Sequence, residues 1–121
     1  MAAPATIWKP TLDCEDIEAT TAFWTWLLGA QVIHSDGNIR FLGPEEGAPI
    51  MCLQGVDEHR VGKNRMHLDL IADDLEKVVA EVQQRGGSQV AGPNVIPMGS
   101  WYVMADPEGN EFCLVTFAAQ D

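Results

Sequence analysis

The two halves of this chain repeat one another. Placing Asp16-Ile17-Glu18 over Asp74-Leu75-Glu76 sets a shift of 58 positions. Over residues 16–32 this shift gives six identities in 17 positions, whereas ordinary residue frequencies give about one by chance. A second match aligns Met51-Cys52-Leu53 with Phe112-Cys113-Leu114 at a slightly larger shift, as an insertion in one loop would produce. A duplicated unit constrains the fold strongly, because both copies are expected to fold alike.

Each copy shows the same order of elements. Short apolar runs at 6–14 and 66–72 are typical of strands, and a helical pattern follows each of them. The helices are expected to begin after Asp16 and Asp74, whose side chains can accept from first-turn amides. They are expected to end at the glycines that follow, Gly29 in copy one and Gly86-Gly87 in copy two.

Three further strand-like runs follow each helix. They cover 31–34, 39–42 and 49–54 in copy one, and 89–91, 101–105 and 111–117 in copy two. Each copy is therefore predicted to be a βαβββ unit, and Pro10 favours an edge position or a bulge for the first strand. We expect an α+β fold with one domain over 1–121, repeat one covering about 5–55 and repeat two about 65–118.

Composition narrows the class of protein. The 121 residues include 18 acidic and 7 basic side chains, for a formal net charge of −11. Such a surface repels nucleic-acid phosphates and anionic lipids, so neither is an expected partner. Three scattered cysteines do not suggest a disulfide framework, and neither a signal peptide nor an apolar run of about 20 residues is visible. We expect a cytoplasmic protein with reduced thiols.

Three segments carry a family likeness: Asp16–Gly29 (DIEATTAFWTWLLG), His67–Leu75 (HLDLIADDL) and Asp106–Leu114 (DPEGNEFCL). With them the chain resembles the vicinal oxygen chelate superfamily, the glyoxalase/bleomycin-resistance proteins, and within it the small glyoxalase-like domain branch. The resemblance implies two βαβββ repeats that form a cupped mixed sheet with the helices outside. It also implies that a small organic ligand or a metal binds in the cup and that the protein is a homodimer. The superfamily mixes lyases, isomerases, dioxygenases, thiol transferases and drug-sequestering proteins, so the fold does not decide the reaction.

Strand alternation predicts which side chains face the cup. In the run 66–72, Met66, Leu68 and Leu70 are apolar and are expected to pack under the helix. The residues that alternate with them are expected to face the cup, and the repeat shifts extend this assignment to the other strands. The expected cup residues are Lys9, Thr11, Asp13, Cys52 and Gln54 from copy one and His67, Asp69, Ile71, Glu111, Cys113 and Val115 from copy two. Trp101 opens an inner strand and is a further candidate for the cup lining.

The resemblance also implies where a metal would bind. Metal-dependent relatives place a His on the first strand of each unit, seven residues before the helix-capping Asp, and a Glu on the last strand. His67 stands at one such position, whereas Lys9 and Cys113 occupy the other two. Because a protonated ammonium cannot act as a ligand, the usual His/His/Glu set is incomplete.

Three interpretations of these residues stay open. His67 and Asp69 can form a buried polar pair that serves structure alone. Alternatively, His67, Asp69, Glu111 and Lys9 make a metal-free site for a polar substrate. In the third interpretation, His67 and Cys113, with or without Cys52, hold zinc, because imidazole and thiolate are good zinc ligands.

Two functions follow from these interpretations. The first is a small-molecule-binding protein that uses the cup without chemistry, with Asp69, Thr11, Gln54 and Trp101 as ligand contacts. The alternative is an enzyme, a lyase, isomerase or similar, acting on a small carbonyl or hydroxyl compound. There His67 or Glu111 would take the proton and Lys9 would stabilise the oxyanion. A metal-assisted variant uses a divalent ion such as zinc at His67 and Cys113.

Overall fold

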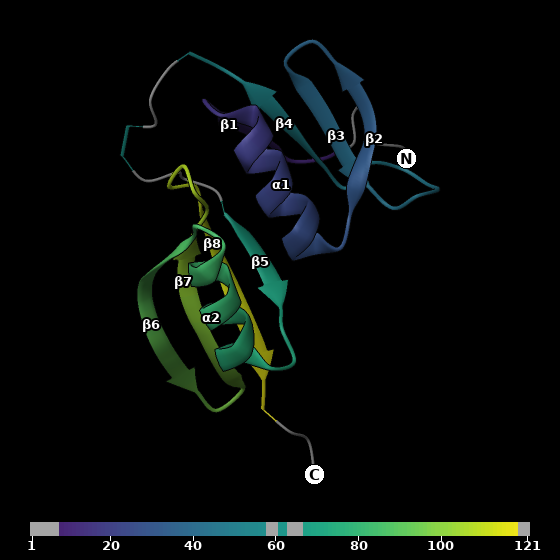
Figure 1. Cartoon of the computed structure of the whole chain (residues 1–121). Coiled ribbons are helices and arrows are strands. Elements are labelled where there is room, and N and C mark those ends of the chain that lie inside the picture. Colours follow the sequence, from purple (N-terminus) through teal and green to yellow (C-terminus); the bar gives the residue numbers. More distant parts are fainter. Residues whose placement is uncertain (1–7, 58–60, 63–66, 119–121) are drawn as a thin grey trace, which may run out of the picture. The chain divides into compact units, whose positions relative to one another are not determined.

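The structure, a computed structural model, describes residues 8–57, 61–62 and 67–118. The chain divides into two compact units, Met1–Glu58 (unit 1) and His59–Asp121 (unit 2). Each unit is a four-stranded mixed sheet with one helix (Figure 1). Residues 6, 7 and 66 of the predicted first strands lie outside the described residues.

Unit 1 contains β1 (Thr11–Cys14), α1 (Ile17–Leu28), β2 (Gln31–Asp36), β3 (Ile39–Gly43) and β4 (Met51–Gly55). Its strands lie in the order β1-β4-β3-β2. β1 pairs with β4 in parallel, and the other neighbours are antiparallel. The first strand is thus an edge strand, one of the two arrangements that Pro10 favoured.

Unit 2 contains β5 (Leu68–Ile71), α2 (Leu75–Gln84), β6 (Ser88–Ile96), β7 (Gly99–Ala105) and β8 (Glu111–Phe117). Its order, β5-β8-β7-β6, and its strand polarity repeat those of unit 1. The register confirms the second sequence match as well, because Thr11 lies opposite Cys52 and the equivalent Asp69 lies opposite Cys113. The predicted α+β fold of two βαβββ repeats is confirmed.

The helix ends follow the predicted capping pattern. The Asp16 carboxylate accepts from the Ala19 amide at 3.1 Å, and the Asp74 carboxylate accepts from the Lys77 amide at 3.4 Å. Gly29 ends α1 in the left-handed conformation at φ 61°, which favours glycine. Among the described residues, no helix has both the length and the apolar character needed to cross a membrane.

Each helix packs on one face of its own sheet. In unit 1, Arg40 of β3 lies 3.2 Å from Glu18 of α1, which identifies the helix-covered face. In unit 2, the Tyr102 hydroxyl of β7 donates to Glu76 of α2. The core lies between helix and sheet, and its largest fully buried side chains are Trp24, Leu42, Met51 and Leu53 in unit 1 and Val82, Met104, Phe112 and Leu114 in unit 2.

Along each strand, the residues that alternate with the core residues lie on the other face of the sheet. The unit's own helix does not cover this face, which is here called the open face of the unit. The open face of unit 1 carries Thr11, Asp13, His34, Ile39, Phe41, Cys52 and Gln54. The open face of unit 2 carries Asp69, Ile71, Trp101, Val103, Glu111, Cys113 and Val115. These are the faces that strand alternation predicted for the cup.

The largest difference between the predicted and observed strands is in β6. We predicted a run over 89–91, but β6 extends over Ser88–Ile96. Gly92 and Pro93 favour a break, yet β6 is an edge strand, where a missing amide donor is tolerated. Its register with β7 shifts between Gln89 and Ala91 and again between Ala91 and Asn94, so the irregular residues are accommodated locally.

Candidate functional site

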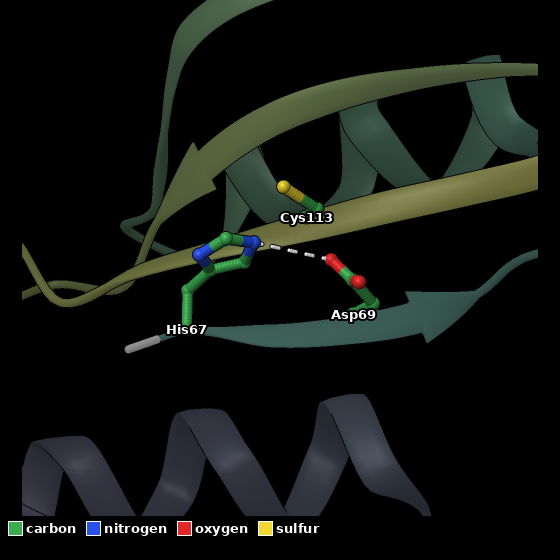
Figure 2. A group of neighbouring side chains, drawn as sticks. All are labelled: His67, Asp69 and Cys113. Carbon is green, nitrogen blue, oxygen red and sulfur yellow. Dashed lines mark ion pairs between the residues drawn. The ribbon is translucent and has the colours of Figure 1, made fainter. Parts of the chain in front are cut away.

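Three potential metal ligands converge on the open face of unit 2: His67, Asp69 and Cys113, here called the donor group (Figure 2). Asp69 and Cys113 lie opposite each other in the parallel register of β5 and β8. His67 comes two residues before Asp69, so strand alternation places it on the same side. One ligand atom from each residue lies within 4.8 Å of the other two.

Within the donor group, His67 and Asp69 are in direct contact. The His67 Nε2 lies 3.3 Å from the Asp69 Oδ1, a contact that becomes an ion pair when the imidazole is protonated. Their side chains are 47% and 69% exposed, so such a pair contributes little to stability. The pair predicted from the sequence is therefore present, but it is solvated rather than buried. Cys113, by contrast, is buried.

Two other predicted site residues lie on the same open face. Glu111 is half-buried and comes two residues before Cys113 on β8. Because Leu68 lies opposite Phe112, continuing that register by one residue places His67 level with Glu111. Trp101 is half-buried on the inner strand β7, opposite Val115. The open face of unit 2 thus carries an imidazole, two carboxylates, a thiol and an indole.

The remaining predicted site residues lie in unit 1. Thr11 pairs with Cys52 across β1 and β4, and Gln54 pairs with Asp13. The Lys9 ammonium lies over the Trp8 ring, 3.7 Å from its centroid, and over the Phe41 ring at 4.7 Å. The predicted site residues therefore fall into two groups, one on the open face of each unit.

The sequence named Asp69 as a ligand contact and did not include it among the metal ligands. Its position opposite Cys113 follows from the β5–β8 register, which only the folded sheet supplies. The available signal was strand alternation, which places His67, Asp69 and Cys113 on the same face. The sequence also did not associate Trp8 and Phe41 with Lys9.

The donor group suits zinc in its chemistry. Imidazole, carboxylate and thiolate are all zinc ligands, and three protein ligands leave a fourth position open. Zinc bonds of about 2.0–2.3 Å in a tetrahedron separate the ligand atoms by roughly 3.3–3.8 Å. The His67–Asp69 contact of 3.3 Å matches this separation, and the three ligand atoms lie within 4.8 Å of one another.

Comparison with known proteins yields one family and several similar folds. The model of the family described as glyoxalase-like domain matches residues 10–115. No curated protein shows significant sequence similarity to the chain. An enzyme of the glyoxalase/bleomycin resistance protein/dioxygenase family from Burkholderia phytofirmans PsJN has a TM-score of 0.79 at 19% identity, over 94% of this chain and 100% of that chain.

Two fosfomycin resistance proteins are also similar in structure. A variant of FosX from Listeria monocytogenes, complexed with Mn(II) and 1S,2S-dihydroxypropylphosphonic acid, has a TM-score of 0.76 at 18% identity, over 93% of this chain and 90% of that chain. FosX from Mesorhizobium loti has a TM-score of 0.72 at 15% identity, over 97% and 95% of the two chains. At such identities the likeness establishes the shared fold alone.

Proposed function

We propose, because this chain belongs to the glyoxalase-like domain family, that it binds a small organic molecule on the open face of unit 2. Family membership confirms the resemblance seen in the sequence. The observation that carries the proposal is the convergence of His67, Asp69 and Cys113 on that face. Apolar side chains surround them, among them Ile71, which is 71% exposed. A few polar groups set in an apolar surface are typical of ligand sites.

The polar groups suit a ligand that bears a hydroxyl or carbonyl oxygen. The imidazole of His67 can donate to such an oxygen or accept from it, while Asp69 orients the ring through the 3.3 Å contact. The Glu111 carboxylate is an acceptor on the same face. Trp101 offers an aromatic surface for the apolar part of the ligand.

Metal-assisted chemistry is a second candidate function, favoured by the mutual proximity of the three ligand atoms within 4.8 Å. A divalent ion held by the donor group would polarise a ligand oxygen and favour loss of a proton nearby. Glu111 would accept that proton, because it lies on the same face and is level with His67 in the strand register. The two candidate functions use the same residues and differ in whether an ion is required.

We also propose, from the family resemblance, that units 1 and 2 make one domain and that the protein is a homodimer. Exposed apolar side chains support pairing, because large exposed apolar patches commonly mark interaction sites. In the β6–β7 hairpin, Val95 is 75% exposed and Met98 is 64% exposed.

Binding can be tested by NMR with isotope-labelled protein and a panel of pyruvate, lactate and dihydroxyacetone, each with and without zinc. We expect at least one compound to shift the amide signals of Asp69 and Cys113 and the indole signal of Trp101. His67→Ala should abolish these shifts, whereas Lys77→Met, which changes an exposed side chain of α2, should not. Shifts confined to other residues would contradict the site, and shifts that require zinc would favour the metal-assisted function.

A further inference from the structure

Unit 1 carries a second group of side chains with a different chemistry: Trp8, Lys9, His34 and Phe41, here called the aromatic–cation group. The Trp8 and Phe41 rings meet edge to face, with centroids 5.6 Å apart and planes at 85°. The His34 ring lies 5.3 Å from Phe41 on its other side in the sheet. The Lys9 ammonium is over both the Trp8 and Phe41 rings, at 3.7 and 4.7 Å.

The strand register places Phe41 and His34 on the open face of unit 1, and Trp8 and Lys9 join them through their contacts with Phe41. One row of paired residues crosses all four strands in the order Thr11, Cys52, Phe41 and His34. The equivalent row of unit 2 contains Asp69, Cys113, Val103 and Ala91. Unit 2 builds the same four-stranded sheet without the aromatic rings, so the fold itself does not require them.

Two features leave the aromatic–cation group able to accept a ligand. Among the residues that the structure describes, no carboxylate lies within ion-pair distance of Lys9, and its ammonium rests on ring faces instead. Ring faces attract a cation but are weak acceptors, so the N–H donors of Lys9 remain able to bind an anion. The Trp8 side chain is 68% exposed, so a flat molecule can cover its indole.

We propose that the aromatic–cation group binds a planar aromatic anion, with an aromatic carboxylate as the simplest case. The carboxylate would accept from the Lys9 ammonium, and the ring would lie against Trp8 and Phe41. The formal net charge of −11 opposes anion binding only weakly at this point, because charges beyond about 8 Å are screened at physiological ionic strength. This site goes beyond the proposed function, since it lies on unit 1 and uses none of the donor group.

Three probes of similar size separate the two parts of this recognition. Benzoate has both the ring and the charge, benzamide has the ring without the charge, and cyclohexanecarboxylate has the charge without the aromatic ring. Isothermal titration calorimetry at low and at physiological salt measures each with the intact chain. We expect benzoate to bind at least about tenfold more tightly than either of the other probes, and more tightly at low salt.

Two substitutions assign the preference to named side chains. Lys9→Met should weaken benzoate to the level of benzamide, and Phe41→Leu should weaken it to the level of cyclohexanecarboxylate. Lys77→Met removes the same charge from α2 and should leave benzoate binding unchanged. Thermal unfolding of each variant shows whether it folds. Lys9 lies outside the strands, so Lys9→Met tests the proposal even where Phe41→Leu is unstable.

Equal binding of the three probes, or no binding of benzoate, would overturn the proposal. So would tight benzoate binding by Lys9→Met. In those cases the contacts of Lys9 with Trp8 and Phe41 serve only to hold Trp8 and Lys9 against the sheet.

Discussion

His67, Asp69 and Cys113 show how the chemistry of a site depends on single residues. The repeat places Lys9 where unit 2 has His67, and Thr11 where it has Asp69, while Cys52 and Cys113 are shared. The same backbone positions therefore carry an ammonium and a hydroxyl in unit 1 and an imidazole and a carboxylate in unit 2. Only the second set can complete a divalent-metal site with the shared thiol, because an ammonium cannot act as a ligand.

The donor group predicts a zinc-dependent gain in stability. At a free zinc concentration 100 times Kd, the unfolding free energy should rise by about 2.7 kcal/mol, because a ligand that binds only the folded state stabilises it. His67→Ala and Cys113→Ser should lose this gain, as measured by thermal unfolding with and without zinc. Cys52→Ser is the matched control, since Cys52 is the buried equivalent in unit 1. If Cys52→Ser also loses the gain in stability, the zinc site that includes Cys52 is supported instead. If Cys113→Ser keeps the gain, the donor group is not the zinc site.

At the scale of elements, two groups of polar contacts join parts of unit 2. The first closes the turn between β7 and β8, where the buried Asp106 carboxylate accepts from the amides of Glu108 and Asn110 at 2.9 and 2.8 Å. The Asn110 side chain adds a third contact at 3.0 Å. The second joins α2 to β7, where the Tyr102 hydroxyl lies 2.8 and 2.9 Å from the two carboxylate oxygens of Glu76.

Replacing Asp106 tests the turn. Asp106→Ala leaves buried donors without their acceptor, so we expect a loss of about 1–3 kcal/mol in unfolding free energy, measured by urea denaturation. Asp36→Ala, in an exposed position beside the β2–β3 turn, should change it by less than about 0.5 kcal/mol. Equal effects of the two substitutions would show that the Asp106 contacts do not stabilise the turn.

Tyr102 predicts a dependence on alkaline pH. The pKa of Tyr102 is raised above its ordinary value of 10.0, chiefly by the hydrogen bond to Glu76, then by burial and by the Glu76 charge. A raised pKa means that the folded state favours the protonated phenol, so the stabilisation is fully present below pH 10 and is lost as pH rises through the folded-state pKa. Tyr102→Phe should therefore be less stable than the wild type at neutral pH, with the difference shrinking in strong alkali.

Tyr102 is the single tyrosine of the chain, so ultraviolet absorbance follows its ionisation directly. The midpoint should lie above 10 in the wild type and move down in Glu76→Gln, which removes the carboxylate charge. A wild-type midpoint at 10 or below would show that the phenol and the carboxylate are not in contact in solution.

At the scale of the whole molecule, duplication supplies two open faces of similar geometry and different chemistry. Unit 1 presents aromatic rings with a lysine, and unit 2 presents the donor group. One fold repeated twice thus carries two different sets of candidate binding residues, one on the open face of each unit.

The proposed homodimer is tested by light scattering of the purified chain. We expect a mass of about twice that of the single chain, because pairing would bury the exposed apolar side chains of the β6–β7 hairpin. Val95→Glu combined with Met98→Glu should give the single-chain mass, since both side chains are exposed there. Val61→Glu, at a position 93% exposed, is the control and should not change the mass. A single-chain mass for the wild type would refute the pairing.

The sequence by itself determined the duplication, the order of elements in each unit and the faces of the strands. These features depend on local patterns: the capping residues Asp16 and Asp74, the terminating Gly29, and the two-residue alternation around His67. Such patterns act over a few residues, so they are visible without the fold. Pro10 likewise favoured an edge strand or a bulge, because a proline has no amide donor for a central position in any sheet.

Only the tertiary structure decided which strands lie side by side. The pairing of β5 with β8 places Asp69 opposite Cys113, and the fold of unit 1 places Phe41 beneath Lys9. The tertiary structure also decided that β6 continues to Ile96, with two register shifts against β7 that no local pattern predicted. Register between distant strands depends on the burial of one face and on backbone pairing across the whole sheet, and a one-residue slip would exchange the two faces. The neighbours of each site residue are therefore properties of the assembled sheet.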